Sequence, residues 1–196
     1  MMTVSIASTA RRLVTLRPVR QEDYGLIFAW QSQPDLAVLL QTPLIPVLHL
    51  EQFVSQLEYR LKDALNPCFI VERRGSGTVI GLAGTDSINL VHGHAYAWVY
   101  LAPEYRKSYF GAAALVRLID FLFIRYNLRK VYTMTGETNP YSLAPLKKAM
   151  RLEGCLRQHY GYAGRYWDLY CFALYRDDWK RGQTQRRWLA TRSDPR

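Results

Sequence analysis

The sequence lacks any long hydrophobic run. No apolar stretch in its 196 residues approaches the roughly 18 residues that a membrane-spanning helix needs. The first residues, MMTVSIASTARRLVTLRPV, include two consecutive arginines and no apolar core of the kind that a secretory signal carries. A membrane protein and a secreted protein are therefore not expected, and we predict a soluble, cytoplasmic protein.

Metal-binding and nucleophilic patterns are also missing. Cys68, Cys155 and Cys171 are odd in number and lie in apolar segments without the spacing of a metal site. We therefore predict buried, reduced thiols. No cluster of His, Cys, Asp and Glu suggests a metal ion, and no Ser–His–Asp set suggests a protein nucleophile. We expect no metal in this protein.

Positive charge is what the sequence has in excess. Its 26 Lys and Arg residues outnumber 16 Asp and Glu residues, which gives a formal net charge of +10. This charge predicts attraction to a nucleotide-bearing cofactor, an acidic protein or a nucleic acid, without choosing among them. No nucleic-acid recognition motif is evident, so nucleic acid is the least favoured partner. Part of the excess lies in residues 181–196, which we interpret as a flexible basic tail or a docking segment for an anionic partner.

The apolar patterns predict one mixed domain over residues 1–180. Helical spacing predicts helices at 20–32, 50–61, 111–126 and 142–150. Ser142 can cap the last of these helices, and Pro145 falls in its first turn, where no backbone N–H is required. Alternation predicts strands at 13–19, 68–73, 78–88, 94–102, 130–135, 156–162 and 165–175. The order β–α–α–β–β–β–α–β–α–β–β places antiparallel strands first and then a crossover helix. We therefore predict an α/β (mixed α+β) fold, with a mixed sheet and helices on both faces.

The stretch APEYRKSYFGAAALVRLIDF, residues 102–121, carries the strongest functional signal. A strand ends before Pro103, and after a loop of six or seven residues a helix begins near Gly111. The first turn of a helix has N–H groups without internal partners, and its dipole favours negative charge. Small residues there let a ligand approach the backbone, and Arg106 and Lys107 add positive charge. This junction is a candidate pyrophosphate site.

Several motifs resemble the GNAT acyltransferases, most closely the branch of ribosomal-protein alanine acetyltransferases and spermidine N-acetyltransferases. The family signature is Arg or Gln, two residues, Gly, one residue, then Gly or Ala; it stands here as Arg106-Lys107-Ser108-Tyr109-Phe110-Gly111. LRPVRQEDYGLIFAWQSQPD, NPYSL and EGCLRQHYGYAGRYWDLYCFAL resemble the same branch, so the likeness spans roughly residues 12–180. It implies a GNAT-type, mostly antiparallel central sheet and acetyl-CoA as cosubstrate.

The resemblance also implies which residues hold the donor. The backbone of Tyr100 and Leu101 should pair with the pantetheine arm of coenzyme A, and Asn139 and Ser142 should lie along that arm. The pyrophosphate should receive the loop's N–H groups and basic charge, from Arg106, Lys107, Ser108, Tyr109, Phe110, Gly111 and Ala112.

Two departures from the family pattern lie on and beside this loop. Tyr109 replaces the first small residue of the signature. Its side chain either crowds the pyrophosphate or stacks over it, or it points outward and only the backbone takes part. Tyr96 stands where many relatives carry a glutamate as general base, although an unperturbed tyrosine is a poor base at neutral pH. Tyr96, Trp98 and Tyr100 share one face of their strand by alternation, as an aromatic substrate cleft or as core packing.

A third departure follows Asn139. Many relatives place a tyrosine seven residues further on, as the acid that protonates the departing thiolate, but that position is Leu146 here. Tyr141 and Glu137 are the nearest substitutes, as catalytic or as surface residues. His159 and Asp168 on the closing hairpin are expected to meet across it, more as a structural pair than as a catalytic one.

The sequence therefore predicts an N-acyltransferase that moves an acetyl group from acetyl-CoA to a primary amine, on a small molecule or a protein N-terminus. An acidic acyl carrier protein as donor, and a catalytically inactive CoA-binding module, stay open as alternatives. Segments 40–49 and 158–168 should shape the acceptor pocket. The Tyr- and Trp-rich closing strands suggest pairing between subunits in a homodimer.

Overall fold

The computed structural model describes residue 10 and residues 12–33 and 49–180. The chain begins with β1 (Val14–Pro18), the 3-10 helix η1 (Gln21–Asp23), α2 (Tyr24–Gln31) and α4 (Leu50–Leu61). It continues through β2 (Cys68–Arg73), β3 (Val79–Asn89), β4 (His94–Leu101), the 3-10 helix η2 (Pro103–Tyr105) and α5 (Phe110–Arg125). It closes with β5 (Lys130–Gly136), α6 (Leu143–Ala149), β6 (Arg151–Tyr162), β7 (Arg165–Tyr175) and α7 (Arg176–Lys180). The predicted order of elements is confirmed, and α7 is an addition to it.

The strands form one sheet in the order β1-β2-β3-β4-β5-β7-β6. β4 and β5 pair in parallel, and the other neighbours pair antiparallel. A parallel pair needs a long crossover connection, and α5 supplies it. The predicted mixed, mostly antiparallel sheet is therefore confirmed.

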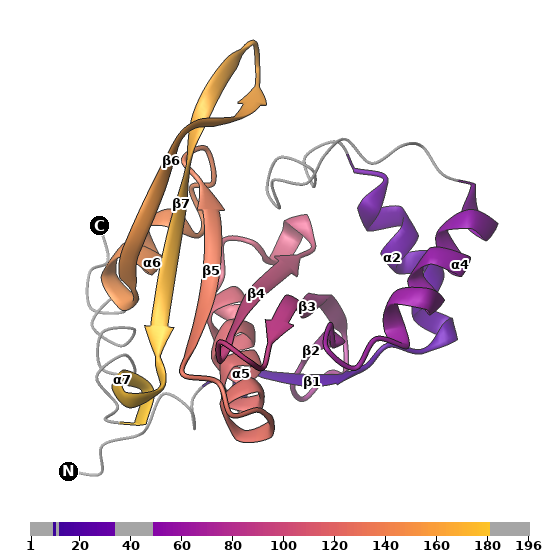
Figure 1. The fold of residues 1–196 in the computed structure, drawn as a ribbon. Helices are drawn as coiled ribbons and strands as arrows, with labels where there is room; N and C mark the ends of the chain where they lie inside the picture. The colour runs from indigo at the N-terminus through magenta and orange to yellow at the C-terminus, as the bar shows by residue number, and fades with distance from the viewer. Residues whose placement is uncertain (1–9, 11, 34–48, 181–196) are drawn as a thin grey trace.

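Helices cover both faces of the sheet, but not over its whole width. The apolar α5 buries Leu118, Ile119 and Leu122 in a core that includes Ala95 and Ala97 of β4. On the opposite face, Ile27 of α2 and Phe53 of α4 pack in a second core with Ile70, Leu82 and Tyr100. Figure 1 shows α2 and α4 gathered beside the β1–β4 half of the sheet, with the β6–β7 hairpin at the other end. The two cores hold β4 from both sides.

β4 and β5 separate halfway along their length. Their parallel pairing runs from His94↔Lys130 to Tyr96↔Tyr132. Beyond it β4 stays paired with β3 as far as Leu101, while β5 stays paired with β7 as far as Gly136. The Thr133 hydroxyl donates to the Ala97 carbonyl oxygen at 2.9 Å just past the last pair. The part of β4 that follows therefore has no strand on its β5 side among the described residues.

The β6–β7 hairpin is longer than predicted. β6 begins at Arg151, before the expected 156, because register shifts at 152–154 and 156–160 interrupt the alternation that marks a strand. After β7, Arg176 anchors α7 by donating to the carbonyl oxygens of Leu128, Phe123 and Tyr126 at 2.5, 2.8 and 2.6 Å. These bonds tie the end of the chain's last strand to the turn before β5.

Some predictions fall outside the described residues: the basic tail at 181–196 and segment 40–48 of the expected acceptor pocket. Among the helices that the structure describes, none combines the length and apolar character needed to cross a membrane.

Candidate functional site

The loop between η2 and α5 forms the helix start that the sequence predicts. α5 begins at Phe110, and its first helical hydrogen bond runs from the Ala113 N–H to the Tyr109 carbonyl oxygen at 3.0 Å. The Phe110 N–H donates to the Ser108 hydroxyl at 3.3 Å, and that hydroxyl donates to the Tyr105 carbonyl oxygen. Ser108 therefore shapes the loop. The N–H groups of Gly111 and Ala112 stand at the open end of the helix, where a ligand can accept them.

The two basic residues of the loop differ in role. The Arg106 side chain turns back onto β4, with Nε donating to the Leu101 carbonyl oxygen at 3.0 Å and Nη2 to the Tyr100 hydroxyl at 3.3 Å. Its guanidinium also lies 5.4 Å from the centre of the Tyr100 ring. Arg106 thus fixes the loop to the end of β4, and the exposed Lys107 is the cation of this loop that faces solvent.

Gly111 is not required by the protein's own packing. A Cβ added there would lie 3.5 Å from Leu101 Cδ1, an ordinary contact, and the residue has no left-handed φ. A glycine at this position is therefore best explained by something that approaches the backbone from outside. The Tyr109 side chain is 58% exposed, which agrees with the reading that only its backbone takes part. Phe110 packs edge-on against Tyr105, 6.1 Å away between ring centres.

The three aromatic residues on one face of β4, Tyr96, Trp98 and Tyr100, lie in different surroundings. The Tyr100 side chain is buried against Trp30, with ring centres 5.6 Å apart. Trp98 is half-buried beneath the Arg60 guanidinium, 5.5 Å from the ring centre. Tyr96 stands apart from this core and stacks on Tyr132. The core-packing reading therefore holds for Tyr100 and Trp98, and a substrate role of Tyr96 stays a prediction.

The loop from β5 to α6 is held by short polar contacts. Asn139 Oδ1 accepts the Tyr141 N–H at 3.1 Å, and the Asn139 N–H donates to the Gly136 carbonyl oxygen at 3.1 Å. Ser142 precedes α6 at the capping position, yet its hydroxyl pairs with the Thr135 hydroxyl instead of capping the helix. The expected Ser142 cap is therefore wrong, because a hydroxyl partner on β5 competes for the side chain. Pro145 lies in the first turn of α6, as predicted.

Tyr160 of β6 supports this loop and was not singled out from the sequence. Its hydroxyl accepts the Thr138 N–H at 3.1 Å and lies 2.7 Å from the Thr138 hydroxyl. The ring covers Gly136 so closely that a Cβ there would lie 2.3 Å from the Tyr160 oxygen. In the sequence, the signal for this contact was Gly136, a glycine at the end of a strand that is followed by a tyrosine-rich hairpin.

The three catalytic candidates lie in two places. Tyr96 is at the point where β4 and β5 part, with its ring 5.0 Å from that of Tyr132 and nearly parallel to it. Burial raises the pKa of Tyr96, so it stays protonated and can donate a proton but not accept one near neutral pH. Glu137 and Tyr141 lie beyond the end of β5, both exposed. Among the described residues, no hydrogen bond joins Tyr96 to either.

The expected pairing of His159 with Asp168 is not what the structure shows. The bulge between Leu156 and Tyr160 gives Gln158 a positive φ of 48°, and its N–H donates to Asp168 Oδ1 at 2.9 Å. Arg157 Nη1 lies 2.5 Å from Asp168 Oδ2. These bonds hold the pKa of Asp168 below its usual value, the Gln158 N–H acting most strongly. Asp168 is therefore a structural carboxylate of the hairpin.

Within residues 10, 12–33 and 49–180, no group of three or more His, Cys, Asp and Glu side chains could hold a metal ion. The three cysteines are free thiols and only half-buried, which is less than predicted. Burial raises the pKa of Cys68 to about 11, so it is a thiol at neutral pH.

Comparisons with known proteins agree with this architecture. A family model described as an acetyltransferase (GNAT) domain matches residues 13–149. An uncharacterized N-acetyltransferase, p20, of Bacillus licheniformis is 26% identical over 164 residues, which cover 82% of this chain and 92% of the relative. A spermidine N(1)-acetyltransferase of Vibrio cholerae is 29% identical over 158 residues, which cover 80% of this chain and 89% of the relative.

Solved structures share the fold at lower identity. Spermidine N-acetyltransferase from Vibrio cholerae in complex with CoA and spermine superposes with a TM-score of 0.76 at 21% identity, covering 90% of this chain and 98% of that one. A dodecameric structure of spermidine N-acetyltransferase from the same organism superposes with a TM-score of 0.73 at 21% identity, covering 85% and 96%. A complex of the enzyme with manganese ions has a TM-score of 0.72 at 21% identity, covering 94% and 99%.

Proposed function

The chain belongs to the GNAT acetyltransferase family, and we propose that it transfers an acetyl group from acetyl-CoA to a primary amine at the point where β4 and β5 part. The observation that carries the proposal is the early end of the β4–β5 pairing at Tyr96 and Tyr132. The released edge of β4 leads directly to the loop before α5. One extended ligand can therefore pair with the strand and reach the helix start.

The residues present fit coenzyme A. Its diphosphate suits the N–H groups of Gly111 and Ala112, the helix dipole and the exposed Lys107. Its pantetheine amides suit the backbone edge of Tyr100 and Leu101, and the loop around Asn139 and Ser142 lies across the gap. With the diphosphate at the helix start and the arm along β4, the thioester end points toward Tyr96. The role of each of these residues is part of the proposal.

The proposed chemistry depends chiefly on holding the two reactants together. The amine nitrogen forms a bond to the thioester carbonyl carbon, the carbon–sulfur bond breaks, and the nitrogen loses one proton while the thiolate gains one. Fixing both reactants removes much of the entropic part of the barrier. Tyr96, with its raised pKa, is suited to donate a hydrogen bond or a proton. Tyr141 and Glu137 are the proposed alternatives near the end of β5.

Coenzyme A is favoured over an acyl carrier protein as the donor. The relatives described above are named N-acetyltransferases, and one fold neighbour is bound to CoA. The space at Gly111 also suits a diphosphate, which a carrier-bound pantetheine lacks at that position.

The test is to titrate the purified protein with acetyl-CoA by calorimetry and to measure free thiol release with a panel of primary amines. Saturable binding followed by amine-dependent thiol release supports the proposal. Binding without release on any amine would favour the inactive CoA-binding module. Absence of acetyl-CoA binding would overturn the proposal.

A further inference from the structure

The acceptor amine must meet the thioester where β4 and β5 part. In the proposed function the donor's diphosphate lies at the start of α5, and its arm follows β4 back from Leu101. Where β4 and β5 part, Ala97 and Thr133 lie on the face of the sheet that α5 covers. Tyr96 and Tyr132 project from the opposite face, which leaves that face for the amine.

An aromatic and apolar surface surrounds this point. The Tyr96 and Tyr132 rings stack with centres 5.0 Å apart at 19°, and His94 lies edge-on to both, 6.0 and 5.7 Å away. Met134, next along this face of β5, is 37% exposed. Among the described residues, α2 and α4 pack over the β1–β4 half of the sheet and not over this part. The surface suits a flat apolar group.

Two carboxylates beside these rings, Asp86 and Glu153, already have cationic partners. Asp86 pairs across β3 and β4 with Tyr96, and its Oδ1 lies 2.5 Å from Arg60 Nη2. Glu153 Oε2 lies 2.6 Å from Lys130 Nζ, and Glu153 also accepts the Tyr175 hydroxyl. Burial alone would raise the pKa of Glu153, but the Lys130 ammonium holds it below its usual value. These two carboxylates are therefore already paired and attract a second ammonium group on a substrate only weakly.

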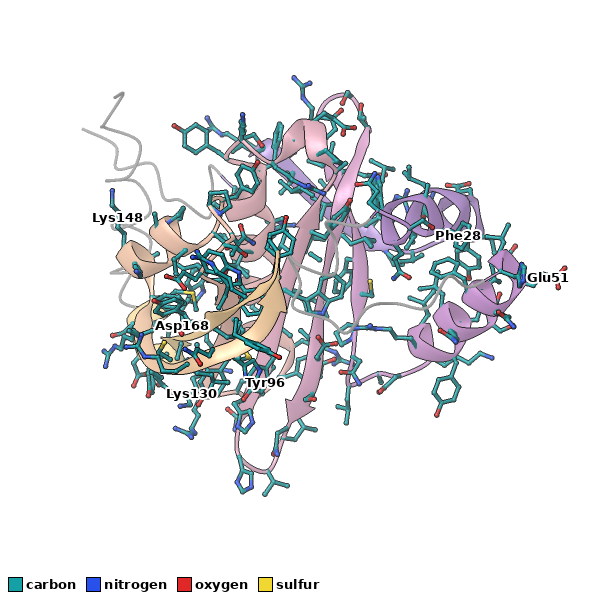
Figure 2. The ribbon with its side chains drawn as sticks, turned by 90° about the horizontal axis from the view of Figure 1, so that it is seen from above. Phe28, Glu51, Tyr96, Lys130, Lys148 and Asp168 are labelled. Carbon is teal, nitrogen blue, oxygen red and sulfur yellow. The ribbon has the colours of Figure 1, made fainter. Side chains whose placement is uncertain are left out.

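The Tyr132 ring, which could attract a cation, already contacts one. The Lys130 Nζ lies 4.4 Å from the Tyr132 ring centre, and Tyr96 stacks on the same ring. Figure 2 shows Tyr96 and Lys130 near each other on the sheet, far from Glu51 of α4. A ring that already holds one ammonium repels a second. Tyr132 therefore offers ring edges to a substrate and not a cation site.

On the same face of the sheet, α4 carries two carboxylates, Glu51 and Glu58. Glu58 is half-buried and near Tyr24 of α2, whose pKa is raised by burial first and by the Glu58 charge second. Residues 34–48 add one acidic residue, Asp35, in sequence. Against a net charge of +10, these are weak attractants for a substrate with several ammonium groups.

We propose that the acceptor is a monoamine with an aromatic or apolar body that lies against Tyr96, Tyr132 and Met134, and not a polyamine. This inference rests on the proposed acetyl transfer. It separates the chain from its relatives named for spermidine, although it shares their fold.

The experiment measures thiol release at saturating acetyl-CoA with 2-phenylethylamine, butylamine and spermidine. We expect kcat/KM for 2-phenylethylamine to exceed that for spermidine at least tenfold and to exceed that for butylamine as well. Equal or faster turnover of spermidine overturns the inference. So does a protein that binds acetyl-CoA but does not turn over 2-phenylethylamine. Failure to bind acetyl-CoA at all is instead a failure of the proposed function.

Four variants test where the amine binds. Tyr132→Leu should lower kcat/KM for 2-phenylethylamine about tenfold with an unchanged KM for acetyl-CoA, because it removes the aromatic wall. Tyr132→Phe should keep most of the activity, which separates the ring from its hydroxyl. Glu58→Gln should leave kcat/KM unchanged for both 2-phenylethylamine and spermidine. If a polyamine site lay on α4, this variant would instead raise the KM for spermidine. Met134→Ala, at an exposed position, repeats the test if Tyr132→Leu does not fold.

Discussion

At the scale of the residue, a substitution of Gly111 should affect ligand binding and stability in opposite directions. A Cβ fits there without a close contact, so Gly111→Ala should leave the free energy of unfolding unchanged or raise it by up to about 1 kcal/mol. The same methyl group would meet a diphosphate at the helix start, and we expect the Kd for acetyl-CoA to rise at least tenfold, about 1.4 kcal/mol. Calorimetry and thermal unfolding measure the two effects.

Gly25→Ala is the matched control for that variant. Gly25 is the second residue of α2, as Gly111 is of α5, and nothing lies within 4 Å of an added Cβ. It should gain similar stability and keep its affinity for acetyl-CoA. Equal affinity in the two variants would show that the diphosphate does not approach Gly111.

The protonation state of Tyr96 leads to a prediction of how kcat/KM depends on pH. Because burial raises its pKa above the usual value of about 10, Tyr96 stays protonated through neutral and mildly alkaline pH and removes no proton from the amine. With an acceptor whose pKa is about 10, similar to that of a lysine amine, kcat/KM should rise roughly tenfold per pH unit from pH 7 to 9. A plateau that begins below pH 8 would reveal a protein base and contradict this assignment.

At the scale of the element, Tyr160 joins the hairpin to the β5–α6 loop. Tyr160→Phe removes two hydrogen-bonding contacts with Thr138 and should destabilise the fold by about 1 kcal/mol. It should also raise the KM for acetyl-CoA several-fold, because the loop that carries Asn139 loses its support. Tyr166→Phe, on the same hairpin and 70% exposed, is the control and should change neither value. An unchanged KM in Tyr160→Phe would mean that this loop does not touch the donor.

Elements were easier to predict from the sequence than contacts. The strand and helix order followed from periodicity, since each element must bury one face. The Ser142 cap and the His159–Asp168 pair were wrong because a Thr135 hydroxyl and a bulge at Gln158 lie outside any local pattern. The inward turn of Arg106 depends on Tyr100 and Leu101, which the sequence places nearby without giving a direction.

At the scale of the whole molecule, the outer edge of the sheet predicts self-association. β6 is an edge strand among the described residues, and its Leu152 and Leu156 are 54% and 45% exposed. Exposed apolar edges favour pairing with a second copy. We expect light scattering to give at least twice the monomer mass of 22.8 kDa, and Leu156→Lys to shift it toward the monomer. A monomer in the unaltered protein at micromolar concentration would contradict this prediction.

The central claim is that coenzyme A lies along the released edge of β4 and at the start of α5. Residue-resolved amide hydrogen exchange, with and without coenzyme A, tests it most directly. We expect added protection at the amides of Gly111 and Ala112 and along β4 from Trp98 to Leu101, with little change in β1 or α4. Saturation with coenzyme A that leaves those amides unprotected, while others gain protection, would contradict it.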